Sequence, residues 1–481
     1  MNNKGQTTVF ISLLICVLLA LTLTAFEGVR LYTGKVKGIA CVHSMRTGIL
    51  ADYNEELFKR YQLLFIDSTY GTGSNGYLEE KITDYMDVFL NGETDHPSVY
   101  EYSVEDISVN DAISILDDDM KLLKKQIMEY EEAVGAADWV ANLLDRVGDT
   151  SSTVESAARQ TEENAREGQE TISSEGVSEQ EDPRDILANM LKGGILNIVM
   201  PEHHLSDEAM PLQRTYASFG NSRSTAFDDI GYLNRFLRAS VNDTKFSGLK
   251  QEAAFLNYIR NHFSNGVHVY DDTVMECELE YLLEGKNSDL KNMEGVANEL
   301  VWMRMPINYG YLVRDPVKKK EAEAVAMGIC AATGTLGLEK VVQYLLLGCW
   351  SYAEALYDVK DLLAGYKVAF IKTGETWKTD LRTLSCSGRV QETNGLYYED
   401  YLMLLFAKDH MLKMNDYYSR MLDIMEINIQ QENPEFFIKN CMGKMTIQGR
   451  IILEPLFATG GNTEDYTYYL NETISYCKEE D

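Results

Sequence analysis

Residues 9–26 read VFISLLICVLLALTLTAF, a run of eighteen residues in which no side chain carries a charge. A helix rises about 1.5 Å per residue, so a helix of this length just crosses the roughly 30 Å hydrocarbon core of a membrane. Lys4 precedes the run, and Glu27 and Arg30 follow it. No second run of this kind occurs in the chain. The sequence therefore predicts one membrane helix that carries one large water-soluble part.

The apolar run favours an anchor over a cleaved signal peptide. Secretory signals have an apolar core of about 7–15 residues and a cleavage site with two small residues. Here the core is longer, and the large Leu23 stands two residues before Ala25, where such a site needs a small one. A lipoprotein site at Cys16 is disfavoured by the bulky Ile15 before it. We therefore expect the segment to stay attached to the protein.

The helical pattern continues beyond Arg30. Apolar residues recur there at spacings of three and four, with one double spacing of seven, which is typical of an amphipathic helix. The stripe consists of Val29, Tyr32, Val36, Ile39, Val42, Ile49, Tyr53, Leu57, Tyr61 and Leu64. The sequence thus predicts one helix over residues 7–65, about 85–90 Å long, whose first third lies in lipid and whose remainder forms a spine.

Composition bounds the class of protein. A chain of 481 residues that is 45% hydrophobic can bury a substantial core, in one or two domains beyond the anchor. The formal net charge of −31 argues against binding to nucleic acid or to an anionic membrane surface. Seven cysteines lie outside the apolar run, without a CxxC pair. Free buried thiols are one interpretation, and a disulfide between Cys386 and Cys441 is a hypothesis that spacing cannot decide.

The expected fold is α+β and predominantly helical. Only eight prolines occur, and long Leu-, Met-, Glu- and Lys-rich stretches predict helices. Alternating residues predict strands that form a small, mostly antiparallel sheet with the C-terminal segment; these strands are expected at residues 99–109, 436–439, 445–456 and 466–470. A helix is expected to open at Asn110 or Asp111.

The predicted domain organisation has four parts. Residues 148–182 are rich in Ser, Thr, Glu, Gln and Gly, cannot bury enough apolar surface to order themselves, and are predicted to form a disordered linker. The other parts are a membrane anchor at 1–30, the spine continuation with a first helical and strand region at 31–147, and a helical domain with C-terminal strands at 183–481.

Three motifs could in principle bind a ligand or a metal. For each of them a purely structural interpretation is favoured. Residues 71–76 complete a formal GxGxxG pattern, but no buried strand precedes it, so a flexible turn is favoured over a nucleotide site. Adjacent residues 117–119 are all Asp, which favours a solvated acidic face over a calcium loop. Residues 202–204 read Glu-His-His without a third ligand at useful spacing, which favours a polar loop over a metal site. We predict no catalytic, cofactor or metal site.

The N-terminus also carries a resemblance. Lys4-Gly5 stands before the apolar helix and Glu27-Gly28-Val29-Arg30 directly after it. This arrangement resembles the TadE/TadG-like pseudopilins of tight-adherence (Tad) pilus systems. More closely, the chain is similar to a clostridial family of single-pass membrane proteins encoded with Tad pilus genes. That likeness extends to residues 61–65, 280–286, 350–355, 358–365 and 398–402.

The resemblance implies a prepilin-type processing or assembly role for Lys4, Gly5, Phe10, Glu27 and Arg30. At the position of Phe10 the pilin pattern has a glutamate, which is a departure. Flanking lysines and arginines do not fix the orientation of the helix. Pilin-like proteins insert with the N-terminus in the cytoplasm, so the resemblance implies a single-pass protein of the cell membrane with an extracellular C-terminal domain.

These observations predict a membrane-anchored, non-enzymatic, extracytoplasmic component of a Tad-type pilus or secretion apparatus. The expected partners are lipid of the cytoplasmic membrane and other pilin-like subunits. No nucleic acid, cofactor or small-molecule substrate is inferred. Two alternatives stay open, namely an anchored extracellular enzyme without a recognisable catalytic motif and a surface binding module.

Overall fold

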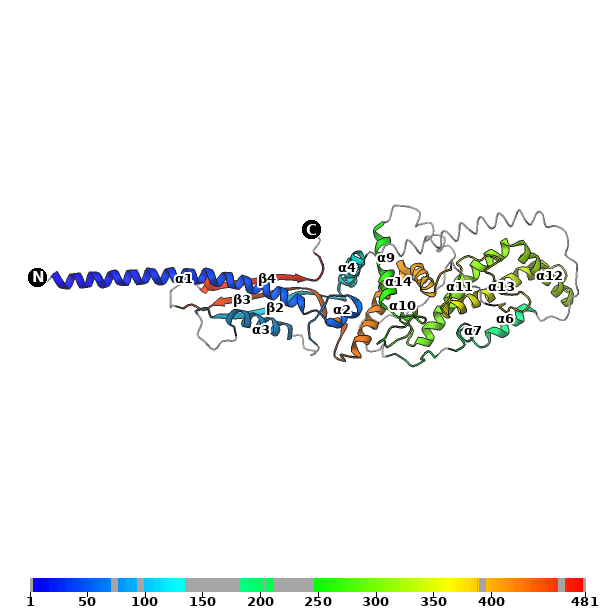
Figure 1. The fold of residues 1–481 in the computed structure, drawn as a ribbon, viewed down its shortest axis with the longest axis horizontal. Helices are drawn as coiled ribbons and strands as arrows, with labels where there is room; N and C mark the ends of the chain where they lie inside the picture. Colours follow the sequence, from blue (N-terminus) through cyan, green and yellow to red (C-terminus); the bar gives the residue numbers. More distant parts are fainter. Residues whose placement is uncertain are drawn as a thin grey trace. The chain divides into compact units, whose positions relative to one another are not determined.

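The protein folds into two compact units. In the computed structural model, the residues described are 3–70, 77–92, 99–134, 182–202, 204–210, 246–386, 388, 395–456 and 463–478. The first unit combines residues 1–126 with 429–481, and the second comprises residues 127–428. Figure 1 gives the labels of the helices and strands in both.

Helix α1 (Asn3–Ala51) dominates the first unit and confirms the long N-terminal helix. The prediction that this helix runs to residue 65 is wrong, because the chain turns at residues 52–54 and starts α2 (Glu55–Tyr61). The Asn54 side chain accepts a hydrogen bond of 2.9 Å from Leu57 N and caps α2. Asn54 N also donates to the Phe65 carbonyl over 2.7 Å, so the chain folds back on itself.

The sheet of the first unit is antiparallel and uses the C-terminal segment. Its strands are β1 (Ile66–Asp67), β2 (Tyr102–Ser114), β3 (Cys441–Leu453) and β4 (Thr467–Ser475), and β3 pairs with each of the others. The α+β class and the sheet with C-terminal strands are thereby confirmed. Because β3 bonds to β2 and also carries β4, the segment expected at 183–481 as one domain is divided between the units after residue 428.

Two local predictions are wrong. Strand β2 begins later than expected and continues to Ser114, so no helix opens at Asn110 or Asp111, and the next helix, α4, spans Asp117–Val134. Positive φ angles at Asp106 (54°) and Asp111 (48°) coincide with irregularities in the pairing, which let the strand continue past residues of low strand propensity. Residues 436–439 do not form a strand; a 3₁₀ turn, η2, occupies Ile438–Asn440.

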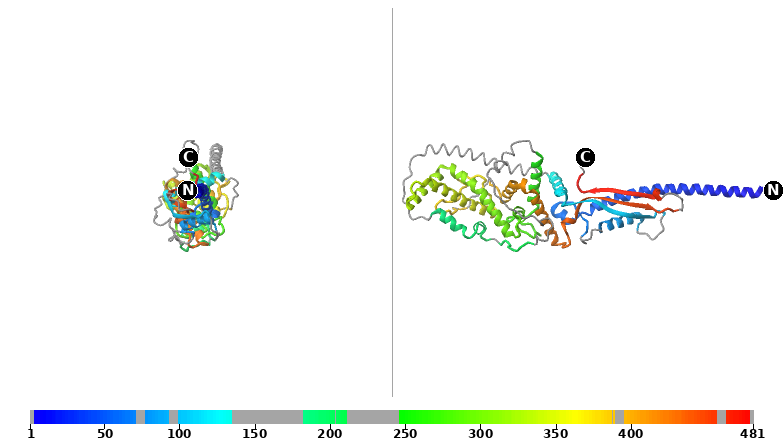
Figure 2. Two further views of the ribbon diagram at one scale, coloured as in Figure 1. Left: turned by 90° about the vertical axis from the view of Figure 1, so that its left-hand side faces the viewer. Right: turned by 180° about the vertical axis from the view of Figure 1, so that it is seen from behind.

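The core of the first unit lies between α1, α3 (Tyr77–Asn91) and one face of the sheet. Figures 1 and 2 show α1 lying along β3 and β4, with its N-terminal part projecting beyond the strands. Met445, Ile447 and Ile451 alternate toward this core from β3. A Cβ on Gly34 would lie 2.7 Å from a methyl of Leu453, so a larger residue there would displace the Leu453 side chain where α1 approaches the sheet.

The second unit is helical. Its elements are α6 (Pro183–Leu191), α7 (Leu196–Val199), α9 (Phe246–His262), α10 (Glu278–Glu284), α11 (Asp289–Arg314), α12 (Pro316–Thr333), α13 (Glu339–Leu363) and most of α14 (Tyr398–Gln430). Helices α11, α12 and α13 pack together around Trp350. The junction between α11 and α12 is set by Asp315, whose side chain accepts from Val317 N and Lys318 N.

Several expectations fall outside the described residues. These are the linker at 148–182 apart from Asp182, the glycine-rich residues 71–76, and His203. All eight cysteines are free thiols, so the Cys386–Cys441 disulfide is not formed. Within the described ranges, no group of three or more His, Cys, Asp or Glu residues is placed to hold a metal ion.

Candidate functional site: the membrane helix and its junction with the sheet

The N-terminal part of α1 exposes its apolar side chains. Every residue from 9 to 26 is exposed, and Phe10 reaches 69%. Burying apolar surface away from water stabilises a protein by about 25 cal/mol per Å². A contiguous exposed apolar run of this size is therefore expected to be buried in lipid or against another protein. Among the described residues, α1 is the one helix that is long and apolar enough to cross a membrane. The segment therefore has the properties of a membrane anchor.

The structure brings together two of the five residues singled out by sequence. Lys4 and Gly5 lie at the start of α1, and Phe10 follows about one and a half turns later. Glu27 and Arg30 lie at least seventeen residues further along the same helix, which corresponds to about 25 Å. The N-terminal trio and the Glu27–Arg30 pair are thus separate features of α1.

Glu27 and Arg30 form a buried ion pair with two hydrogen bonds. Arg30 Nε donates to Glu27 Oε2 over 3.0 Å, and Arg30 Nη2 donates to Glu27 Oε1 over 2.9 Å. Arg30 is only 2% exposed. The hydrogen bond from Arg30 holds the pKa of Glu27 below its ordinary value, although burial opposes this. Such a two-pronged pair fixes the geometry of both side chains.

Arg30 also binds the sheet. Its Nη1 donates to the Val99 carbonyl over 2.8 Å, and its Nη2 donates to the Glu454 carbonyl over 2.5 Å. Val99 precedes β2 and Glu454 directly follows β3. The pair, which we call the Glu27–Arg30 clamp, therefore fastens one end of the sheet to α1 immediately after the uncharged run. The i, i+3 spacing of the two charges was visible in the sequence, whereas their carbonyl partners were not.

From the level of the clamp onward, α1 has a second exposed apolar face. Val29, Tyr32, Val36 and Ile39 are 65%, 75%, 51% and 43% exposed. Their spacing of three and four residues places them on one side of the helix, opposite the side that packs on the sheet. We call these four residues the spine stripe. It continues the exposed apolar surface of residues 9–26 further along the same helix.

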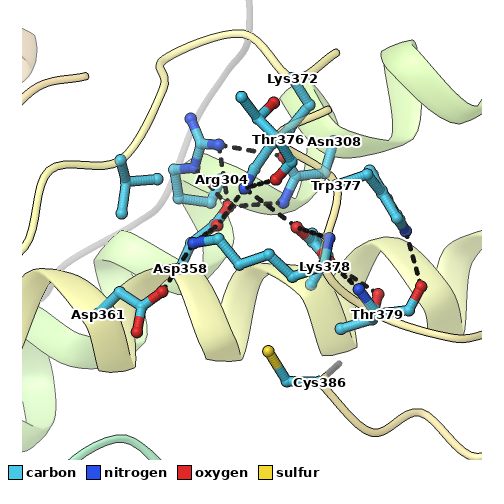
Figure 3. A network of polar contacts seen from close by, with 12 residues as sticks. Arg304, Asn308, Asp358, Asp361, Lys372, Thr376, Trp377, Lys378, Thr379 and Cys386 are labelled. Atoms are coloured by element: carbon cyan, nitrogen blue, oxygen red, sulfur yellow. Dashed lines mark hydrogen bonds and ion pairs between the residues drawn. The ribbon is translucent and has the colours of Figure 1, made fainter. Parts of the chain in front are cut away.

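The second unit contains a buried network of charges between α11, α13 and the loop that follows α13 (Figure 3). Arg304 of α11 donates to Asp358 Oδ2 of α13 from Nε over 3.1 Å and from Nη2 over 2.9 Å. Lys372 Nζ lies 2.6 Å from Asp358 Oδ1 and 3.0 Å from Glu354 Oε1. Lys378 Nζ lies 2.7 Å from Asp361 Oδ2. Three cations thus face three carboxylates.

Glu354 organises the loop that brings these lysines in. It accepts hydrogen bonds from Lys378 N, Thr379 N and Thr379 Oγ1 over 2.7–3.2 Å. Figure 3 shows the loop lysines pointing toward the carboxylates that α13 presents. Glu354, Asp358 and Asp361 are spaced at three and four residues, so they share one face of α13. That spacing was a readable signal that the sequence analysis did not use.

The buried network has the character of a structural element. Arg304, Glu354, Asp358 and Lys372 have no exposed side-chain surface, so solvent and substrate do not reach them. Burial alone would raise the pKa of Asp358, but the charges of Lys372, Arg304 and Lys378 outweigh it and hold that pKa far below its ordinary value. Each of the three cations faces at least one carboxylate of α13.

A second pair of buried carboxylates lies on α10. Glu278 accepts from Ser264 N and from Asn428 Nδ2, each over 2.7 Å. Glu280 accepts from Gly266 N over 3.0 Å and from the Tyr398 hydroxyl over 2.6 Å. Burial raises the pKa of both carboxyl groups to about 7, although these hydrogen bonds oppose the rise. The two side chains hold the turn at 264–268 and respond to pH near neutrality.

Residues 173–452, more than half of the 481 residues, match the model of a family of unknown function, DUF5702. The chain belongs to this family. The DUF5702 match contains α10 to α14, the buried network and most of β3, whereas α1 and β2 precede it. No curated protein and no solved structure matches the chain.

The raised pKa values of Glu278 and Glu280 predict that the second unit is more stable in mild acid than above neutral pH. Between pH 4.5 and about 7 the folded state holds protons on Glu278 and Glu280 that the unfolded state has released. The added stability is therefore fully present below pH 4.5 and is lost as the pH rises through about 7. Each pKa unit corresponds to about 1.4 kcal/mol. The free energy of unfolding of the second unit, measured by urea unfolding, should therefore fall by a few kcal/mol between pH 5 and pH 8.

Glu280→Gln tests this assignment. Glu280 Oε1 accepts both hydrogen bonds, while Oε2 has no hydrogen-bond partner among the described residues. A glutamine can keep both bonds through its oxygen and removes the buried charge, so it should stabilise the second unit at pH 8 and leave it nearly unchanged at pH 5. The exposed Glu323→Gln serves as control. An unaltered pH dependence in Glu280→Gln would contradict the assignment.

Proposed function

We propose that this DUF5702 protein is a membrane-anchored, non-enzymatic, extracytoplasmic component of a Tad-type pilus or secretion apparatus, with a pseudopilin-like structural or assembly role. The supporting observation is that α1 is one unbroken helix that contains both an exposed apolar segment and the helix on which the sheet packs. Residues 9–26 expose an uncharged apolar surface, and the continuation of the same helix to Ala51 forms the spine on which the sheet packs. In the proposed topology the N-terminus is cytoplasmic, residues 9–26 cross the membrane, and the chain from Glu27 onward is extracytoplasmic.

The proposed mechanism uses the two exposed surfaces of α1 in turn. Lipid of the cytoplasmic membrane covers residues 9–26 while the protein waits in the bilayer. On assembly, the spine stripe and the membrane segment together pack against the helices of other pilin-like subunits. The exposed spine stripe is then removed from water, which favours assembly, while residues 9–26 exchange contacts with lipid for contacts with helices. The Glu27–Arg30 clamp keeps the sheet attached to α1 at the point where the helix leaves the lipid.

N-terminal sequencing of the protein from membranes and from sheared surface fibres tests the proposal. We expect the protein in both fractions, with residues 9–26 retained. Sequencing also reads whether the chain starts at Met1 or after Gly5. A soluble protein whose first residue lies beyond Phe26 would refute the anchor, and absence from the fibres of cells that make them would refute the pilus role.

Substitutions in the spine stripe test assembly through α1 directly. Tyr32→Ser combined with Val36→Ser should leave the membrane fraction unchanged but remove the protein from fibres, because both side chains are exposed and contribute to no core. The matched control is Val317→Ser combined with Leu336→Ser, two exposed apolar residues of the second unit. Equal incorporation of both double variants would count against assembly through α1.

A further inference from the structure

The first unit contains a pocket of about 340 Å³ at the end of the sheet that lies far from the Glu27–Arg30 clamp. Its wall is formed by α4, by β2 and β3, and by the residues that follow β4. Four of the lining residues are lysines in a chain whose net charge is −31. The complete lining is Ile113, Asp118, Lys121, Leu122, Lys125, Lys444, Ser475, Cys477 and Lys478.

The strand register and one helix turn bring the lysines together. Lys444 of the central strand β3 pairs with Ile113 of β2 and with Ser475 of β4, so these three side chains form one row across the same face. Lys121 and Lys125 are four residues apart on α4 and therefore point the same way. Lys125 Nζ donates to the Lys478 carbonyl over 2.5 Å, which joins α4 to the chain after β4.

The charges of this pocket are not balanced by its own wall. Asp118 is the single carboxylate in the lining, against four lysines. Within the described residues, no ion pair forms to Lys121, Lys125, Lys444 or Lys478, whereas Lys59 and Lys81 of the same unit are paired. The positive charges of neighbouring lysines repel one another. A bound anion with two or more negative charges offsets this repulsion.

We propose that this lysine pocket binds a small soluble anion that carries phosphate. Its volume is at the lower end for ligand sites and holds several water molecules, so phosphate or diphosphate fits with part of its hydration. Lysine ammonium groups bind phosphate as point charges from several directions, and the Ser475 hydroxyl adds a polar group. Ile113 and Leu122 provide the apolar part of the wall.

The position of the pocket favours a soluble ligand over a lipid headgroup. Tyr476, next to the lining residues Ser475 and Cys477, donates from its hydroxyl to the Ile49 carbonyl of α1. Ile49 follows Arg30 by nineteen residues, which is about 29 Å along the helix. Headgroups around a bilayer crossed by residues 9–26 would end well before this point.

Titration calorimetry of the full chain in phosphatidylcholine nanodiscs at pH 8 tests the proposal. We expect pyrophosphate to bind with a Kd below about 1 mM, more weakly at higher salt, and more tightly than sulfate. Lys121→Gln combined with Lys444→Gln should weaken binding at least tenfold. The control, Lys35→Gln combined with Lys59→Gln, removes the same charge elsewhere in the first unit and should stay within about twofold of the wild type.

Three results would overturn the assignment. They are no binding of pyrophosphate at 10 mM, equal loss in the test and control variants, and binding of sulfate as tight as that of pyrophosphate. A soluble short-chain phosphatidylglycerol that binds more tightly than pyrophosphate, and does so only with the pocket lysines intact, would assign the pocket to a lipid headgroup instead. If the double variant unfolds, the exposed Lys478→Gln takes its place, with an expected severalfold loss of affinity.

Discussion

Asp358→Asn is expected to destabilise the second unit by about 3–5 kcal/mol, enough to unfold it or nearly so. The Asp358 carboxylate lies 2.6 Å from Lys372 Nζ and 2.9 Å from Arg304 Nη2, and none of these side chains reaches solvent. An amide keeps the shape of the side chain but removes its charge, which leaves buried cations in excess over carboxylates. The cost is the penalty of burying an unpaired charge, and not the worth of a single hydrogen bond.

Tryptophan fluorescence during urea unfolding measures the loss of stability in the second unit specifically. All four tryptophans, Trp139, Trp302, Trp350 and Trp377, belong to residues 127–428. The matched control is Asp271→Asn, which makes the same chemical change at an exposed position of the second unit and should alter the midpoint little. If Asp358→Asn and Asp271→Asn unfold at the same urea concentration, the buried network contributes nothing to stability.

The second large effect is expected from Arg30→Gln. The substitution leaves the Glu27 carboxylate buried without its partner and withdraws the donors from the Val99 and Glu454 carbonyls. A loss of about 3–5 kcal/mol should open the adjacent ends of β2 and β3. Hydrogen exchange measured by mass spectrometry should then accelerate by 100-fold or more in peptides that cover residues 99–104 and 450–454, since each 1.4 kcal/mol corresponds to a factor of ten.

Two further variants identify the cause of this opening. Arg46→Gln removes an exposed arginine from the same helix and should leave exchange unchanged. Glu27→Gln combined with Arg30→Gln should be less destabilised than Arg30→Gln alone, because no lone charge is left buried. An additive double variant would show that Glu27 and Arg30 act independently, contrary to the bidentate pair in the structure.

The parts of the fold that depend on local pattern were predictable. The uncharged run at residues 9–26 indicated a helix near the N-terminus, and the few prolines together with the Leu-, Met-, Glu- and Lys-rich stretches indicated a predominantly helical fold. The end of α1 was missed because the apolar stripe continues through the turn at 52–54, where the side chain of Asn54 starts a new helix instead. The length of β2 was missed because positive φ angles at Asp106 and Asp111 carry the strand through a polar stretch.

The candidate sites depend on contacts that no local pattern encodes. The Glu27–Arg30 spacing was legible, but the carbonyls that complete the clamp come from residues 69 and 424 positions away. In the buried network, Arg304, Asp358 and Lys372 belong to three segments that meet only in the folded second unit. The lysines of the pocket are spread from residue 121 to residue 478, so their convergence follows from the sheet register and from the contact of α4 with the residues after β4.

The central strand β3 dictates an order of events during synthesis. Cys441, which begins β3, follows Ser114, the last residue of β2, by 327 positions. At about 5–20 residues per second a ribosome needs roughly 16–65 s to cover that distance. Throughout this interval the nascent chain holds α1, α3 and β2 without the strand that joins them, while the helices of the second unit are being synthesised. A premature stop between residues 431 and 440 would thus release a chain with all helices of the second unit but with a first unit that lacks β3 and β4.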